Sequence, residues 1–273
     1  MPELAQLVVF LLFGLLSGLI GGLLGVGGGT VYVPVLTAYY AAYSGHNNEF
    51  VVFVIGNSLF LTLISGLSGS WKQFRSKNFY LREVLLVGGG GAATALATTI
   101  FLQGATWYKR EQFALFFTML LIPLIVRLLL KQEPKDLKGG AIVSPWKLVV
   151  VGVFSGIVSA MSGLGGGVVM VPLLADRLNF PIKTASSISL GAIVLMATSS
   201  LLFYSTSLPA WQVSEWQIGW LALPAVLPMA LGVVLAAPFG VRLSHSISPR
   251  TMKLIFLLFF IVVILQMNFS IFG

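Results

Sequence analysis

The chain has 273 residues, of which 57% are hydrophobic and only 9% are charged. Soluble domains carry about 25% charged residues, so this composition excludes a soluble globular protein and predicts a polytopic membrane protein. The formal charge of +8 would suit a nucleic-acid partner in a soluble protein, but we attribute it to basic cytoplasmic loops and expect no nucleic-acid binding. The chain has no cysteine, which excludes disulfides and cysteine-ligated metals.

Uncharged or nearly uncharged runs recur along the chain, and a helix needs about 20 apolar residues to cross a bilayer. In chain order these runs are 4–24, 50–70, 84–104, 112–130, 147–164, 184–205, 216–239 and 253–272. Two further runs, 30–43 and 168–180, are too short to cross easily at about 1.5 Å per residue. We interpret the first run as a membrane segment rather than a cleaved signal peptide, because no basic region precedes it.

Basic residues concentrate in three connecting segments, 71–83, 131–147 and 240–253, which the positive-inside rule places in the cytoplasm. Segments 43–49 and 204–217 contain no Lys or Arg and are expected outside. With these connecting segments placed inside and outside, span 50–70 runs inward and its counterpart 184–205 runs outward. The two halves are therefore opposite in orientation, which requires an odd number of segments in each half of the chain.

We therefore predict five segments in each half, two inverted-topology repeats, and both termini outside the cell. This arrangement places every Lys and Arg inside except Lys109 and Arg110. The boundaries are 1–131 for the first membrane repeat, 132–146 for a cytoplasmic linker and 147–273 for the second membrane repeat.

The repeat rests on two glycine-rich stretches, GGLLGVGGGTVYVPVL at 21–36 and SAMSGLGGGVVMVPLL at 159–174. They align without gaps at an offset of 138 residues. Ten positions coincide, namely Ser17/Ser155, Gly18/Gly156, Gly25/Gly163, Gly27/Gly165, Gly28/Gly166, Gly29/Gly167, Val31/Val169, Val33/Val171, Pro34/Pro172 and Leu36/Leu174. We call residues 25–29 the first glycine segment and residues 163–167 the second. A weaker match sets GNS at 56–58 opposite ASS at 185–187.

Each glycine segment is predicted to break a membrane helix and form the tip of a hairpin. Broken helices in inverted repeats line substrate sites near the bilayer midplane in many transporters, and glycine permits the positive φ that such a break needs. The helix that follows each break begins with unpaired N–H groups, which favour an anion. The alternative is that these glycines only allow close helix packing, which is our interpretation of VGGGGAATALA at 87–97.

The motif pair resembles the sulfite exporter TauE/SafE family of membrane transporters, over nearly the whole chain. The resemblance rests on GLLGVGGGTVYVPVL at 22–36, SGLGGGVVMVPLL at 162–174, the pairs Asn57-Ser58 and Ser186-Ser187, and SPRTMKLIFLLFFIVVILQM at 248–267. It implies transport of a small, typically sulfur-containing anion such as sulfite, thiosulfate, a sulfonate or sulfoacetate. Asn57 departs from the Thr-Ser or Ser-Ser usual in the family.

The predicted substrate site combines backbone N–H groups with small polar side chains from both halves. Its members are Gly25, Gly27, Gly28, Gly29, Thr30, Asn57, Ser58, Ser162, Gly163, Gly165, Gly166, Gly167, Ser186 and Ser187. The alternative for each serine or threonine is a hydroxyl bonded to a carbonyl of its own helix.

No ionisable residue lies at the centre of a predicted span, which argues against a cation pump. The chain has no Walker A, H-E-x-x-H or G-x-S-x-G motif, so we expect neither an enzyme nor a cofactor or metal site. We predict a secondary transporter of the cell (inner) membrane that works by alternating access, and leave a coupled proton open. The alternatives are an anion channel-like pore and a membrane sensor or assembly subunit that does not transport.

Overall fold

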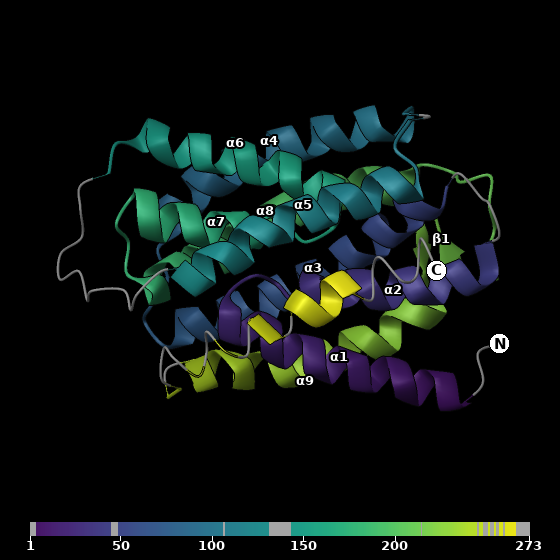
Figure 1. The fold of residues 1–273 in the computed structure, drawn as a ribbon, viewed down its shortest axis with the longest axis horizontal. Helices are drawn as coiled ribbons and strands as arrows, with labels where there is room; N and C mark the ends of the chain where they lie inside the picture. The colour runs from purple at the N-terminus through teal and green to yellow at the C-terminus, as the bar shows by residue number, and fades with distance from the viewer. Residues whose placement is uncertain are drawn as a thin grey trace.

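The computed structural model describes residues 4–44, 49–105, 107–130, 143–213, 215–244, 246–247 and most of 251–265. Apart from one short hairpin it is helical (Figure 1). The helices of the first half are α1 (Leu4–Leu24), α2 (Gly29–Ser44), α3 (Phe50–Arg75), α4 (Leu81–Gln103) and α5 (Arg110–Leu130). The second half contains α6 (Pro145–Ser162), α7 (Gly167–Pro172), the π-helix η1 (Leu173–Arg177), α8 (Ile182–Thr206), β1 (Gln217–Ile218), β2 (Leu221–Ala222) and α9 (Leu223–Ser244). The described residues between 251 and 265 are helical too.

Six of these helices, α1, α3, α4, α6, α8 and α9, are long and apolar enough to cross a membrane. The prediction of a polytopic α-helical membrane protein is therefore confirmed. The run predicted at 216–239 begins as a helix only at Leu223, because residues 217–222 form the β1–β2 hairpin. Residues 45–48, 131–142 and 266–273, which include most of the predicted linker and the end of the last run, lie outside the described residues.

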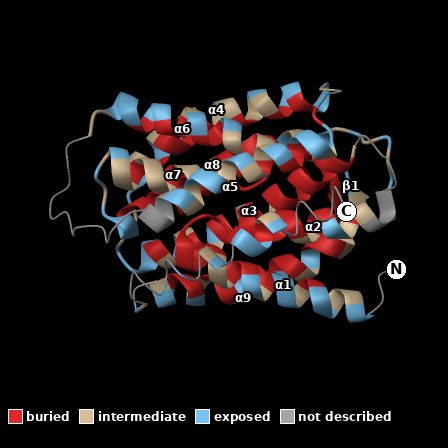
Figure 2. Ribbon diagram, viewed as in Figure 1, coloured by how far each residue is buried: buried red, intermediate tan, exposed pale blue. Residues whose placement is uncertain are grey.

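The side chains are distributed as expected for a bundle surrounded by lipid. Large apolar side chains face outward, among them Phe101 at 65% and Phe154 at 59% exposure. Small polar side chains such as Ser17, Asn57 and Thr62 are instead fully buried between the helices. Figure 2 shows buried residues along the inward faces of the bundle and exposed residues along its outer faces. Water would disfavour this arrangement, whereas hydrocarbon does not.

Two helix pairs, α1–α9 and α4–α6, pack so closely that their backbones touch. A Cβ added at Gly22 would overlap the carbonyl oxygen of Ala237, and one at Gly240 would overlap that of Leu19. On the other pair, a Cβ at Gly152 would overlap the carbonyl oxygen of Val87. Small residues allow this approach in membranes, where helix association depends on van der Waals packing. The prediction that 87–97 forms a packing face is confirmed.

Both pairs join helices from opposite halves of the sequence. The first-half helix α1 packs on the second-half helix α9, and the second-half helix α6 packs on the first-half helix α4. Between the pairs, α3 and α8 contact one another, and each also packs on a helix of the opposite half, α3 on α9 and α8 on α4. The halves are therefore interlocked and do not form two separate domains in space.

We expect Gly152→Ala to destabilise the protein by about 1–3 kcal/mol, because the new methyl group forces α4 and α6 apart. Gly89→Ala is the matched control, since a Cβ there has no atom within 4 Å. It should cost nothing and gain up to about 1 kcal/mol from helix propensity. Thermal unfolding of the purified variants in detergent measures both effects, and equal midpoints would contradict the close packing of α4 on α6.

Candidate functional site

The two glycine segments adopt the same backbone conformation. Positive φ values occur at Gly25, Gly27 and Gly28, at +70°, +77° and +73°. The corresponding second-half glycines, at 163, 165 and 166, have values of +73°, +73° and +75°. L-residues rarely adopt these angles, so the recurrence of glycine is explained by the chain geometry.

Each glycine segment joins two helices that form a hairpin, as predicted. α1 ends at Leu24 and α2 begins at Gly29, while α6 ends at Ser162 and α7 begins at Gly167. In Figure 1, α1 begins at the right-hand end of the molecule and α6 at the left-hand end, so the hairpins enter the bundle from opposite ends. The breaks lie at the glycines and not at the prolines, because Pro34 is inside α2 and Pro172 is the last residue of α7.

The two segments meet in the interior of the bundle through reciprocal contacts. A Cβ on Gly29 would lie 2.6 Å from Cα of Leu164, and a Cβ on Gly167 would lie 2.8 Å from Cα of Val26. Val26 and Leu164 correspond to each other at the repeat offset. Any side chain at Gly29 or Gly167 would therefore push the two segments apart.

Thr62 of α3 and Ile193 of α8 lie against both glycine segments. A Cβ on Gly27 would lie 2.9 Å from the Thr62 methyl group and 3.2 Å from Ile193 Cδ1. A Cβ on Gly165 would overlap the same methyl group and lie 3.3 Å from Ile193 Cγ2. Sequence reasoning missed Thr62, although it stands four residues after Ser58 and thus on the same helix face.

The first backbone N–H groups of α2 and α7 come before the first hydrogen bond within each helix. Val31 and Tyr32 donate to the carbonyl of Gly28, and Val169 and Met170 donate to that of Gly166. The N–H groups of residues 28–30 and 166–168 have no acceptor one turn back in their own helix. These residues belong to the two glycine segments and the first turns of α2 and α7, which lie in contact with each other.

Buried hydroxyl groups without a partner surround this region. Among the described residues, the side-chain oxygens of Thr30, Thr62, Ser155, Ser159 and Ser189 have no hydrogen-bond partner. Leaving a buried polar group unpaired costs about 1–3 kcal/mol. A group of such atoms at one place calls for a function or a ligand.

Ser58 and Ser186 each contact the glycine segment of the other half. The Ser58 hydroxyl donates to the carbonyl of Gly163 at 2.8 Å, and a Cβ on Gly25 would overlap the Ser186 hydroxyl. Since Gly25 and Gly163 are equivalent, these contacts pair Ser58 with Ser186 and differ by one residue from the sequence pairing of 58 with 187.

The other two predicted serines have partners within the protein. The Ser162 hydroxyl donates to Val158 in its own helix at 2.6 Å and accepts from the N–H of Leu164. The Ser187 hydroxyl donates to the carbonyl of Asn78. Ser162 therefore lies at the second glycine segment, whereas Ser187 lies at the α3–α4 connection (residues 76–80).

Asn57 holds the β1–β2 hairpin in this conformation. Its amide nitrogen donates to the carbonyls of Phe53 at 2.7 Å and Trp220 at 2.9 Å, and its oxygen accepts from the N–H of Ala222 at 2.9 Å. Both amide donors are thus engaged by protein groups. The departure from Ser or Thr at this position is explained by these bonds, because a hydroxyl could not make all three.

The α8–α9 connection (residues 207–222) covers the end of the bundle where α3 begins. The Glu49 carboxylate accepts from the N–H groups of Ala210 at 3.1 Å and Trp211 at 2.7 Å. The ring of Phe53 packs edge-on against Trp211 and at a tilt against Trp220, with centroid distances of 5.0 and 5.2 Å. These bonds and ring contacts close this end of the bundle above Asn57.

The α3–α4 connection closes the opposite end in a corresponding way. Asn78 donates to the carbonyl of Lys183 at 3.4 Å, and Thr184 donates to the Tyr80 hydroxyl at 3.3 Å. Each connection therefore packs on the first turns of the other central helix. Residues 25–34 and 162–168 are all buried, so the glycine segments are occluded from solvent at both ends.

Interlocked spanning helices with two broken hairpins meeting at the centre define a polytopic membrane protein of the transporter class. Over residues 10–267 the chain matches the family model described as Sulfite exporter TauE/SafE, and it belongs to that family. It is not an enzyme by that membership.

Three relatives extend over nearly the full chain, and each carries the name probable membrane transporter protein. The proteins from Methanocaldococcus jannaschii and Haemophilus influenzae are 25% and 27% identical to it, over 92% and 96% of this chain and 91% and 97% of their own lengths. The relative from Bacillus subtilis is 21% identical over 91% of this chain and 92% of its own. No solved structure matches the chain.

We expect Asn57→Ala to loosen the β1–β2 hairpin, because it leaves the Trp220 carbonyl and the Ala222 N–H unpaired at about 1–3 kcal/mol each. The chain has no cysteine, so a single cysteine at Leu221 reports the opening through its rate of thiol labelling. Labelling should accelerate with Asn57→Ala and not with Asn78→Ala, which disturbs the opposite end. Equal rates would mean that Asn57 does not hold the hairpin.

Proposed function

We propose that this protein is a secondary transporter that moves a small sulfur-containing oxyanion across the cell membrane by alternating access. One observation carries the proposal, namely the two opposed glycine segments whose free N–H groups share a buried region with unpartnered hydroxyls. Hydrogen-bond donors without an acceptor in the protein are suited to the oxygens of an anion. The family description, which names sulfite, supports the substrate class.

The donors in this site are neutral, which suits a substrate that has to be released. The described Lys and Arg side chains belong to helix ends or connections, for example Lys72 and Arg75 in the last turn of α3 and Arg242 in the last turn of α9. An anion that binds to N–H and hydroxyl groups replaces its hydrogen bonds to water by hydrogen bonds to the protein. It forms no strong ion pair that would slow its release. We assign the contacts to residues 28–30 and 166–168, with Thr62 and Ser186, while Ser58 stays bonded to the Gly163 carbonyl.

The halves are proposed to be inverted repeats related by a pseudo-two-fold axis between the glycine segments. The shared φ pattern, the reciprocal contacts and the opposite entry of the hairpins support this arrangement. The end of the bundle with the last turns of α3 and α9 carries basic residues and would face the cytoplasm. The end with the α8–α9 connection, and with it both termini, would face outside.

The closures at the two ends are proposed to act as alternate gates. The moving bodies would be the group α1, α2, α3 and α9 and the group α4, α6, α7 and α8, since helices pack most extensively within these groups. A negative interior favours exit of an anion by about 2.3 kcal/mol per charge per 100 mV. Export therefore needs no coupling, whereas import requires a coupled ion such as a proton.

We expect purified protein in liposomes to take up one sulfur oxyanion with saturation. Labelled sulfite, thiosulfate, sulfoacetate, sulfate and chloride are compared with and without a pH gradient, and empty liposomes are the control. Acceleration by the gradient would identify a coupled proton. Flux that does not saturate would favour an anion pore, and no flux in folded protein would favour a sensor or assembly subunit.

We expect Thr62→Val to raise the KM of the transported anion about tenfold, because a hydrogen bond to a charged group is lost. Thermal stability should stay equal or rise, since the Thr62 hydroxyl has no protein partner to lose. Thr37→Val is the matched control, because its hydroxyl in α2 is also buried without a partner but stands two turns beyond the first glycine segment. A drop in stability without a change in KM would contradict a substrate contact.

A further inference from the structure

The first glycine segment has a tyrosine hydroxyl beside it, from a residue that has no tyrosine counterpart at the repeat offset in the second half. A Cβ on Gly28 would lie 2.6 Å from the Tyr32 hydroxyl oxygen, so the phenol points at the start of its own helix, α2. The side chain is fully buried, and among the described residues its oxygen has no hydrogen-bond partner. At the repeat offset, the second half has Met170 at this position. The two segments thus share a backbone conformation but differ in their donors.

Two serines from other helices lie within hydrogen-bonding reach of the Tyr32 side chain, Ser17 of α1 and Ser65 of α3. The Ser17 hydroxyl is engaged, since it donates to the carbonyls of Phe13 at 2.5 Å and Gly14 at 3.1 Å. The Ser65 hydroxyl is fully buried and has no partner within the described part of the chain. The Tyr32 and Ser65 hydroxyl groups therefore lie close to each other, with the Tyr32 oxygen beside Gly28, and neither makes a hydrogen bond of regular geometry within the described part of the chain.

We propose that Tyr32 and Ser65 bind the oxygens of the transported anion and determine its selectivity, which places the anion on the first-half side of the site. This inference rests on the proposed function. A buried phenol without a partner incurs a desolvation cost, and an anion oxygen removes that cost. An oxyanion can accept from fixed donors with several separate oxygens, whereas a halide is a single acceptor atom that fits fewer of them. Oxyanions should therefore depend on Tyr32 more than halides do.

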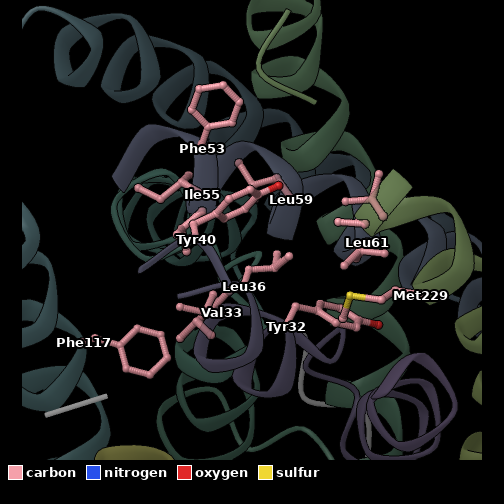
Figure 3. Packing of buried hydrophobic residues seen from close by; sticks show 14 of the residues in the cluster. Tyr32, Val33, Leu36, Tyr40, Phe53, Ile55, Leu59, Leu61, Phe117 and Met229 are labelled. Carbon is pink, nitrogen blue, oxygen red and sulfur yellow. The ribbon is translucent and has the colours of Figure 1, made fainter. Parts of the chain in front are cut away.

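Tyr40, on the same helix, is a matched control for Tyr32. Figure 3 shows the two rings apart from each other, with Leu36 between them. Both side chains are fully buried, and both hydroxyl oxygens lack a partner among the described residues. Tyr40 stands two turns beyond Tyr32, where its ring packs against Phe53 at 5.9 Å. Replacement of either by phenylalanine keeps the ring and removes only the hydroxyl.

The test is liposome uptake by wild type, Tyr32→Phe, Tyr40→Phe and Ser65→Ala, with sulfite as labelled substrate and sulfate, thiosulfate and chloride as competitors. We expect Tyr32→Phe and Ser65→Ala to raise the KM for sulfite about tenfold with little change in maximal rate. Inhibition by chloride should change less than the KM for sulfite does. Tyr40→Phe should behave as wild type, and thermal unfolding verifies that every variant is folded.

Each other outcome has a definite meaning. Wild-type protein that transports none of the anions refutes the proposed function, and this inference falls with it. Wild-type transport with an unchanged KM in both Tyr32→Phe and Ser65→Ala refutes the inference and leaves the proposed function standing. Equal losses in Tyr32→Phe and Tyr40→Phe, or equal losses of sulfite and chloride binding, also refute it, because they indicate a general effect of buried hydroxyls.

Discussion

The contact between the two glycine segments is the constraint on which the rest of the bundle depends. Gly29 and Gly167 allow the backbone of each segment to approach the other, and three glycines with positive φ in each segment reverse the chain at the centre. Such irregular backbone is tolerated at membrane depth only where protein or a polar cavity surrounds it. The helices α3 and α8 supply that surrounding through Thr62 and Ile193.

Close helix packing and unpartnered polar groups lie in different parts of this fold. Stability comes from the outer pairs α1–α9 and α4–α6, where backbone carbonyls pack on glycines. The centre instead carries unpartnered hydroxyls, a local cost that a ligand can relieve. Under the proposed function, an anion would occupy this centre while the outer helix pairs keep their packing.

Much of the fold could be predicted from the sequence. The repeat at a single offset predicted both hairpins, and the glycines at matching positions predicted the turns with positive φ that join their helices. Thr62 and Tyr32 were not predicted, since neither has a counterpart at the repeat offset that would single it out. The role of Asn57 depended on a hairpin more than 160 residues away, which no local pattern indicates. The prediction of a helix from residue 216 was wrong, because residues 216–222, WQIGWLA, carry no charged side chain that would separate the hairpin from the span after it.

The exchange of helices between the halves also bears on how the protein is made. α1 is synthesised first, yet its close partner α9 follows only after the 198 residues between Leu24 and Leu223. The face of α1 that carries glycines therefore has no α9 to pack against while the helices between them insert into the membrane. By contrast, α4 meets α6 after only one intervening helix. Assembly should thus begin around α4, α6 and α8 and finish when α9 reaches α1, so that a chain truncated before α9 keeps an unpaired first hairpin.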